Sequence, residues 1–201
     1  EIWNSDGYWN REFQPWNAVS DYSTLKNMGV EGISKKRLIG FLSKFADELD
    51  AFAATRMYVL TMNDAQYAKE FETAKKVLDT LPPDRRASEL RSAFDNFGMK
   101  ELAAEQLEKL YEMGKLNLYE KQSLLSYWLY GNQNVYRDTI PDSFFSSPNR
   151  AKAVKLMEEI APVDTEVSDS TTTVMLICYY AKIGDSEKLS QALKKFLPKI
   201  Q

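Results

Sequence analysis

Carboxylates at helical spacing are the side chains of this sequence most able to do chemistry. Four glutamates recur every three or four residues, which places them on one side of a helix: Glu101, Glu105, Glu108 and Glu112. Carboxylate oxygens in such a row can hold a divalent cation. Lysines are interspersed with them, at Lys100, Lys109 and Lys115. The row is therefore interpreted as a solvated helix face, and no metal site and no cofactor is expected.

The 201-residue chain contains no histidine. This excludes Ser-His-Asp and Cys-His catalytic arrangements, HExxH metal sites and zinc fingers. Two carboxylates can hydrolyse a glycosidic bond without histidine. One hypothesis is therefore a carbohydrate-binding or carboxylate-dependent glycan-processing domain that uses Asp and Glu side chains near Trp9 and Trp16. Because 29 acidic residues supply many accidental pairs, the leading expectation is a protein that is not an enzyme.

The single cysteine, Cys178, follows Leu176 and Ile177 in an apolar run. This neighbourhood predicts a buried thiol that reacts slowly. One cysteine cannot form an intrachain disulfide, so the redox compartment stays open.

The composition is that of an ordinary globular chain. Hydrophobic residues make up 44% and charged residues 27%, and 26 basic against 29 acidic side chains give a net charge of −3. Such a balance does not attract nucleic acid, which is not an expected partner. No apolar run is long enough to span a membrane. The chain begins with Glu1 rather than Met, which motivates a further hypothesis: a soluble accessory domain of a larger, membrane-anchored bacterial protein, located outside the cytoplasm.

Residues 1–33 form an aromatic-rich segment that is predicted to be irregular. Trp9, Phe13 and Trp16 have helical spacing, but Pro15 lies inside that span and predicts one short helical turn at best. Three interpretations of the aromatic residues remain open. They cover the exposed apolar end of a helical array, lie at a membrane interface close to the N-terminus, or stack on a ligand such as a sugar ring.

From Ser34 onward the apolar residues recur with the period of a helix, and no segment alternates as a strand would. Ser34 is a candidate N-cap for a helix that runs to about Asp50. Helix above roughly 60% of residues and no sheet are expected. The further helices are expected at 51–62, 71–81, 87–96, 102–113, 118–130, 150–160, 171–183 and 186–197, with a long loop at 132–148.

Helix pairs recur in residues 34–201, with approximate units 51–83, 84–117, 118–162 and 163–201. The stretch from Tyr179 to Lys188 resembles the tetratricopeptide-like family, in which a tyrosine precedes a glycine-aspartate turn and a second helix. Phe94, Gly98, Ala103 and Leu107 are similar to the same family pattern. The resemblance implies an all-α, right-handed array of antiparallel helix hairpins, an α-solenoid whose first helices line a concave surface that binds a protein or peptide.

If the hairpins stack in that way, the first helices present a binding surface. The candidate residues are Arg91, Asp95, Tyr127, Tyr130, Tyr179 and Lys182. Tyrosine mixed with charge is typical of recognition surfaces. The alternative is that the three tyrosines complete the core between units.

Overall fold

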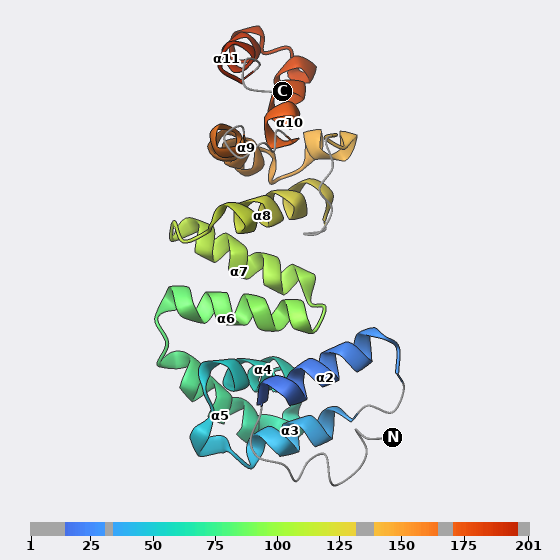
Figure 1. Cartoon of the computed structure of the whole chain (residues 1–201), viewed down its shortest axis with the longest axis vertical. Coiled ribbons are helices and arrows are strands. Elements are labelled where there is room, and N and C mark those ends of the chain that lie inside the picture. The colour runs from blue at the N-terminus through green and yellow to red at the C-terminus, as the bar shows by residue number, and fades with distance from the viewer. Residues whose placement is uncertain (1–14, 31–33, 132–138, 165–170, 197–201) are drawn as a thin grey trace. The chain divides into compact units, whose positions relative to one another are not determined.

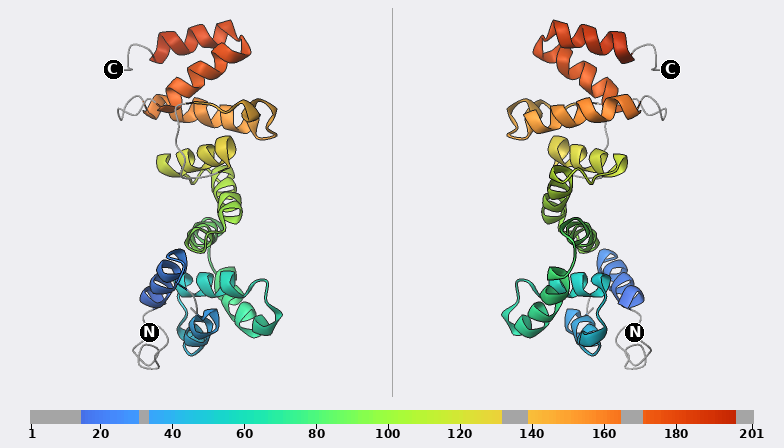
Figure 2. Two further views of the ribbon diagram at one scale, coloured as in Figure 1. Left: turned by 90° about the vertical axis from the view of Figure 1, so that its right-hand side faces the viewer. Right: turned by 90° about the vertical axis from the view of Figure 1, so that its left-hand side faces the viewer.

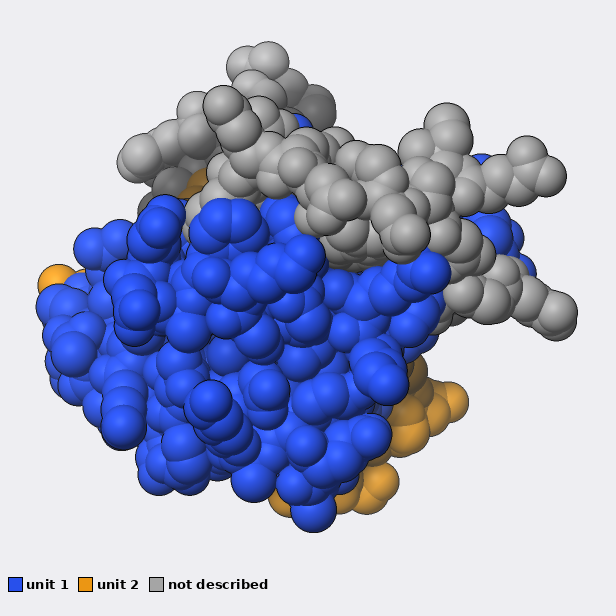
Figure 3. All heavy atoms as spheres, turned by 90° about the horizontal axis from the view of Figure 1, so that it is seen from below, with its two compact units in different colours: residues 1–113 blue, residues 114–201 orange. Residues whose placement is uncertain are grey.

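The computed structural model describes residues 15–30, 34–131, 139–164 and 171–196 (Figure 1). Within them, 81% of the residues are helical, ten α-helices are present and no strand occurs. The prediction of a mostly helical chain is confirmed for this part of the sequence. The chain divides into two units, residues 1–113 and 114–201 (Figure 3).

The first described element of unit 1 is a regular helix, in a stretch where the sequence predicted an irregular segment. Helix α2 runs from Pro15 to Asn27. The prediction of one short helical turn at best was therefore wrong for residues 15–27. Pro15 is the first residue of the helix, where its missing N–H would have no intrahelical partner. Ala18, Val19 and Tyr22 of this helix are buried. The aromatic residues before Pro15 lie outside the described residues.

The next two helices are separated by a break that the sequence analysis missed. Helix α3 runs from Lys35 to Ser43, and the Ser34 side chain caps it by accepting from the Arg37 N–H at 3.3 Å. The cap is confirmed, but the helix does not extend to Asp50. Asp50 is instead the N-cap of α4, Ala51–Thr61, and accepts from the Ala53 N–H at 2.7 Å. A cap residue needs non-helical backbone, so a helix through Asp50 is excluded.

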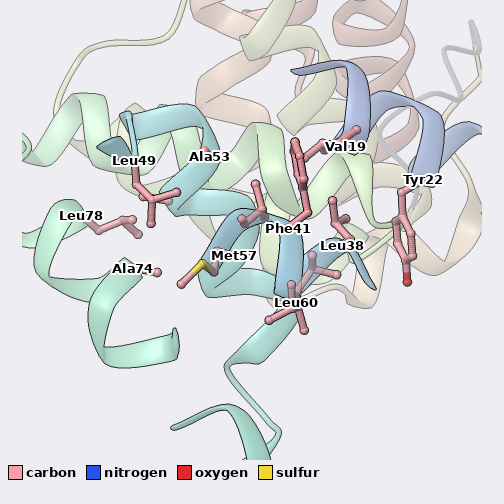
Figure 4. Close-up of a cluster of buried hydrophobic side chains, with 14 residues drawn as sticks. Val19, Tyr22, Leu38, Phe41, Leu49, Ala53, Met57, Leu60, Ala74 and Leu78 are labelled. Carbon is pink, nitrogen blue, oxygen red and sulfur yellow. The ribbon is translucent and has the colours of Figure 1, made fainter. Parts of the chain in front are cut away.

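Two helix pairs complete unit 1. Helices α4 and α5 (Ala68–Asp79) form one pair, and α6 (Pro83–Asn96) and α7 (Lys100–Glu112) form the other (Figures 1 and 2). Gly98 has a φ of +71° in the α6–α7 turn, a conformation that favours glycine. Helix α4 also contacts α2, α3 and α6. Its side chains are therefore buried on several faces, and residues from α2, α3, α4 and α5 converge in one cluster (Figure 4).

The described residues of unit 2 contain four α-helices. Helix α8 (Leu118–Tyr130) starts with a capping box between Asn117 and Glu120 and ends at Gly131, whose φ is +68°. Helix α9 (Arg150–Asp164) continues through Pro162, beyond the predicted end at residue 160. Helices α10 (Thr171–Ile183) and α11 (Ser186–Phe196) form the terminal hairpin that the sequence predicted.

The expected loop at 132–148 has a structured second half. A 3-10 helix spans Asp142–Ser146, and Phe144 within it is 1% exposed. The ring of Phe145 stacks on Tyr179 of α10, with centroids 5.9 Å apart. These aromatic contacts hold residues 142–146 against α10. Among the helices of the described ranges, none has both the length and the apolar character that crossing a membrane requires.

Candidate functional site

One hollow in unit 1 lies among α5, α6 and α7, and is called the α5–α7 groove here. Its volume is about 510 Å³. The lining residues come mainly from these three helices: Tyr58, Lys75, Leu78, Asp79, Pro83, Arg86, Ala87, Leu90, Gln106, Lys109, Glu112 and Met113. A concave surface of this size is the default candidate for a binding site.

The groove combines an apolar floor with charged margins. Leu78 and Ala87 are buried, and the Tyr58 ring is held by stacking on Phe71 with centroids 4.9 Å apart. Arg86 pairs with Asp79 at 2.9 Å, and Lys109 donates to Gln106 at 3.4 Å. Met113 leaves 38% of its surface exposed at the groove. An apolar strip between charged side chains can accept an amphipathic segment of another chain.

A second, more polar hollow lies between α2 and the end of α6, and is called the α2–α6 hollow. Its volume is about 290 Å³, and Val19, Ser20, Ser23, Thr24, Phe52, Asp95 and Asn96 line it. The Ser23 hydroxyl is buried and has no hydrogen-bond partner among the described residues. A buried hydroxyl without a partner is uncommon in proteins. Five of the seven lining residues have side chains that can form hydrogen bonds: Ser20, Ser23, Thr24, Asp95 and Asn96.

Behind this hollow lies a buried arginine that the sequence analysis did not single out. Arg56 of α4 is 2% exposed. It donates to Glu89 at 3.3 Å, to Ser92 at 2.6 Å and to Asn96 at 2.9 Å, all on α6. Its guanidinium carbon lies 3.8 Å from the centroid of the Phe52 ring. Burial lowers the pKa of Arg56, and the charge of Glu89 acts in the opposite direction.

The sequence contained one signal for Arg56. It is the only charged residue in α4, a helix of otherwise uncharged and mostly apolar residues. A helix that is apolar all round is buried on every face. A charge within it must therefore be buried as well, and must find partners on a neighbouring helix.

Two of the predicted binding residues, Arg91 and Asp95, lie together on α6. Their side chains form an ion pair at 3.2 Å. Asp95 lines the α2–α6 hollow. Burial raises the pKa of Asp95, and the charges of Arg91 and Lys100 oppose that rise.

The other four predicted residues belong to unit 2. Tyr127 is half-buried, and the Tyr130 hydroxyl donates to the Thr139 carbonyl at 2.7 Å. Tyr179 is 5% exposed, and its hydroxyl accepts from Arg150 at 2.9 Å. Such burial favours the alternative interpretation, in which Tyr179 is a packing residue. Lys182 is exposed, pairs with Asp142 and lies 4.7 Å from the centroid of the Phe145 ring.

The prediction for Cys178 was wrong, since the thiol is exposed. Helix α10 buries Met175, Leu176, Tyr179 and Tyr180. At 3.6 residues per turn these residues share one face, and Cys178 lies on the opposite side of the helix. Apolar neighbours in the sequence therefore did not indicate burial at this position.

The described residues contain no group of three or more Cys, Asp and Glu side chains placed to hold a metal ion. In comparisons with known proteins, no family model, no curated protein and no solved structure matches this chain.

Proposed function

We propose that the protein is a non-catalytic scaffold of tetratricopeptide-like helix hairpins, and that the α5–α7 groove binds an amphipathic helix of a partner protein. The observation that carries the proposal is the groove itself, where an apolar floor is bounded by charged side chains from successive helices. The pairing of α4 with α5 and of α6 with α7, together with the contact between α4 and α6, supports the hairpin array.

The lining indicates what the partner helix carries. Leu78, Ala87 and Leu90 on the floor suit apolar side chains repeated every three or four residues. The margins hold three cations, Lys75, Arg86 and Lys109, and two anions, Asp79 and Glu112. Acidic residues beside the apolar stripe of the partner would complement this small positive excess.

The proposed groove differs from the surface that the resemblance implied. First helices were expected to line it, whereas the second helices α5 and α7 supply six of its twelve lining residues, and Met113, directly after α7, supplies a seventh. On the first-helix side, α2 already packs against α4. The second-helix side is therefore the better candidate for a partner.

Selection from a displayed library of random peptides, with the full chain immobilised, tests the proposal. We expect enrichment of sequences with apolar residues at helical spacing and flanking acidic residues. Met113→Glu places a carboxylate in the groove and should weaken binding of the enriched peptides at least tenfold. Met28→Glu is the matched control, because Met28 is 72% exposed and lies outside the groove. Failure to enrich any sequence family, or equal binding by the Met113→Glu variant, would contradict the proposal.

A further inference from the structure

The α2–α6 hollow has one wall made of hydroxyl groups. Ser20, Ser23 and Thr24 are spaced three and four residues apart, so they share one face of α2. Ser20 and Thr24 are exposed at the mouth of the hollow, whereas the Ser23 hydroxyl is buried without a partner in the described structure. Each hydroxyl can both donate and accept a hydrogen bond.

The opposite wall is the last turn of α6, where the orientation of Asn96 follows from its partner. Its Oδ1 lies 2.9 Å from a guanidinium nitrogen of Arg56. A guanidinium can only donate, so the amide oxygen must face Arg56. The NH₂ group of Asn96 is then left to donate elsewhere, beside the Asp95 carboxylate that can accept.

The charges around the hollow are already balanced within the protein. Arg56 pairs with Glu89, and Arg91 pairs with Asp95. A charged ligand would have to compete with one of these pairs. A neutral ligand whose neighbouring atoms donate and accept hydrogen bonds can bind without breaking either ion pair.

We propose that the α2–α6 hollow binds a neutral polyhydroxylated ligand, namely a single hexose unit. Adjacent sugar hydroxyls can donate to Asp95 and accept from Asn96, and the exposed Ser20 and Thr24 hydroxyls of α2 can bond to the hydroxyls on the other side. Phe52 supplies an apolar surface for the C–H groups of the ring. The volume of about 290 Å³ lies just below the usual range of small-molecule sites, about 300–1,000 Å³, and therefore suits one ring rather than a chain of them.

Amide spectra of the isotope-labelled full chain, titrated separately with glucose, galactose and N-acetylglucosamine, test this site. At least one of these sugars is expected to shift the amide signals of Ser20–Thr24 and of Asp95 and Asn96. Ser20→Ala removes one hydrogen-bonding group, and Asp95→Asn replaces a charged acceptor by a weaker neutral one, so each should weaken binding about two- to tenfold. Ser190→Ala is the matched control, because Ser190 is exposed on α11 and lies outside the hollow.

The expected pattern is unchanged in the Met113→Glu variant, since that residue belongs to the α5–α7 groove. The proposed sugar site and the proposed peptide groove can therefore be refuted independently of each other. Absence of shifts with all three sugars at tens of millimolar, or shifts confined to other helices, would overturn the proposal. Binding that Ser20→Ala and Asp95→Asn both leave unchanged would also overturn it. Shifts of the same amides by methylammonium but not by any sugar would identify a cation site instead.

Discussion

Removing the counter-charge of Arg56 should destabilise unit 1 more than removing Arg56 itself. Arg56 is 2% exposed, whereas the Glu89 side chain is 26% exposed. At their separation of 3.3 Å, two unit charges attract each other by about 5 kcal/mol at an effective dielectric constant of about 20. Solvent at Glu89 reduces this value. We therefore expect Glu89→Gln to lower the free energy of unfolding by about 2–4 kcal/mol, because a buried guanidinium would lack its anion.

Arg56→Met should cost less, about 1–2 kcal/mol. Methionine keeps an apolar stem against the Phe52 ring, and the half-exposed partners Glu89 and Ser92 can turn to water. In the double variant Arg56→Met/Glu89→Gln, the second substitution should lower the free energy of unfolding further by less than about 0.5 kcal/mol, because the guanidinium that Glu89 neutralises is absent.

Hydrogen exchange of peptides from α4 and α6, combined with urea unfolding followed by circular dichroism, measures these differences for unit 1. Arg86→Met is the control, because Arg86 pairs with Asp79 at 2.9 Å while both side chains are largely exposed, at 42% and 54%. That substitution should change the free energy of unfolding by less than about 1 kcal/mol despite the shorter distance. The reasoning fails if Glu89→Gln is no more harmful than Arg86→Met, or if Arg56→Met is the more harmful of the two variants at the buried pair.

Three further predictions concern unit 2. Tyr179→Ala should lower the free energy of unfolding by about 3 kcal/mol and Tyr179→Phe by about 1 kcal/mol, because the first removes a buried ring and the second only the hydroxyl bonded to Arg150; melting curves that match wild type would return Tyr179 to the candidate binding surface. Cys178 should be labelled by a thiol reagent at about the rate of a free thiol in the native protein, and labelling that requires denaturant would refute its exposure. Burial, and to a smaller extent the hydrogen bond to Glu158, raises the pKa of Tyr180 above its ordinary value of 10.0. The folded state therefore holds the phenolic proton more tightly than the unfolded state does. This contribution to the free energy of unfolding is complete below pH 10 and is lost as the pH rises above 10. Tyr180→Phe should therefore flatten the loss of stability in strong alkali, and an unchanged slope would contradict the assignment.

The helical character and several ends of the helices could be predicted from local chemistry. Gly98 and Gly131 adopt the left-handed backbone that favours glycine after a helix, and Ser34 is the cap that its position indicated. These features depend on a few neighbouring residues. Pro15 and Asp50 were misinterpreted because a proline or an aspartate can either interrupt a helix or stand at the start of one. The sequence pattern alone did not distinguish these two roles.

The candidate sites were less predictable because they depend on contacts between distant segments. Asp95 was selected as a candidate. Ser20 and Ser23 lie more than 70 positions before it in the sequence, and join it only because α2 packs beside α4. Tyr179 and Cys178 are adjacent in sequence and differ in burial because they point to different sides of α10. Which side is covered is decided by α9, α11 and the 3-10 helix at residues 142–146.

The burial of Tyr22 bears on how this protein is best produced in shortened form. Tyr22 meets Phe97 edge to face, with ring centroids 6.1 Å apart, and lies in the same cluster as Leu38 and Phe41. A chain trimmed to begin at Ser34 would leave the apolar side chains of that cluster open to solvent. Such a product would tend to aggregate during purification. Expression boundaries that retain α2 in full avoid that loss, even though the helical repeats were predicted only from Ser34 onward.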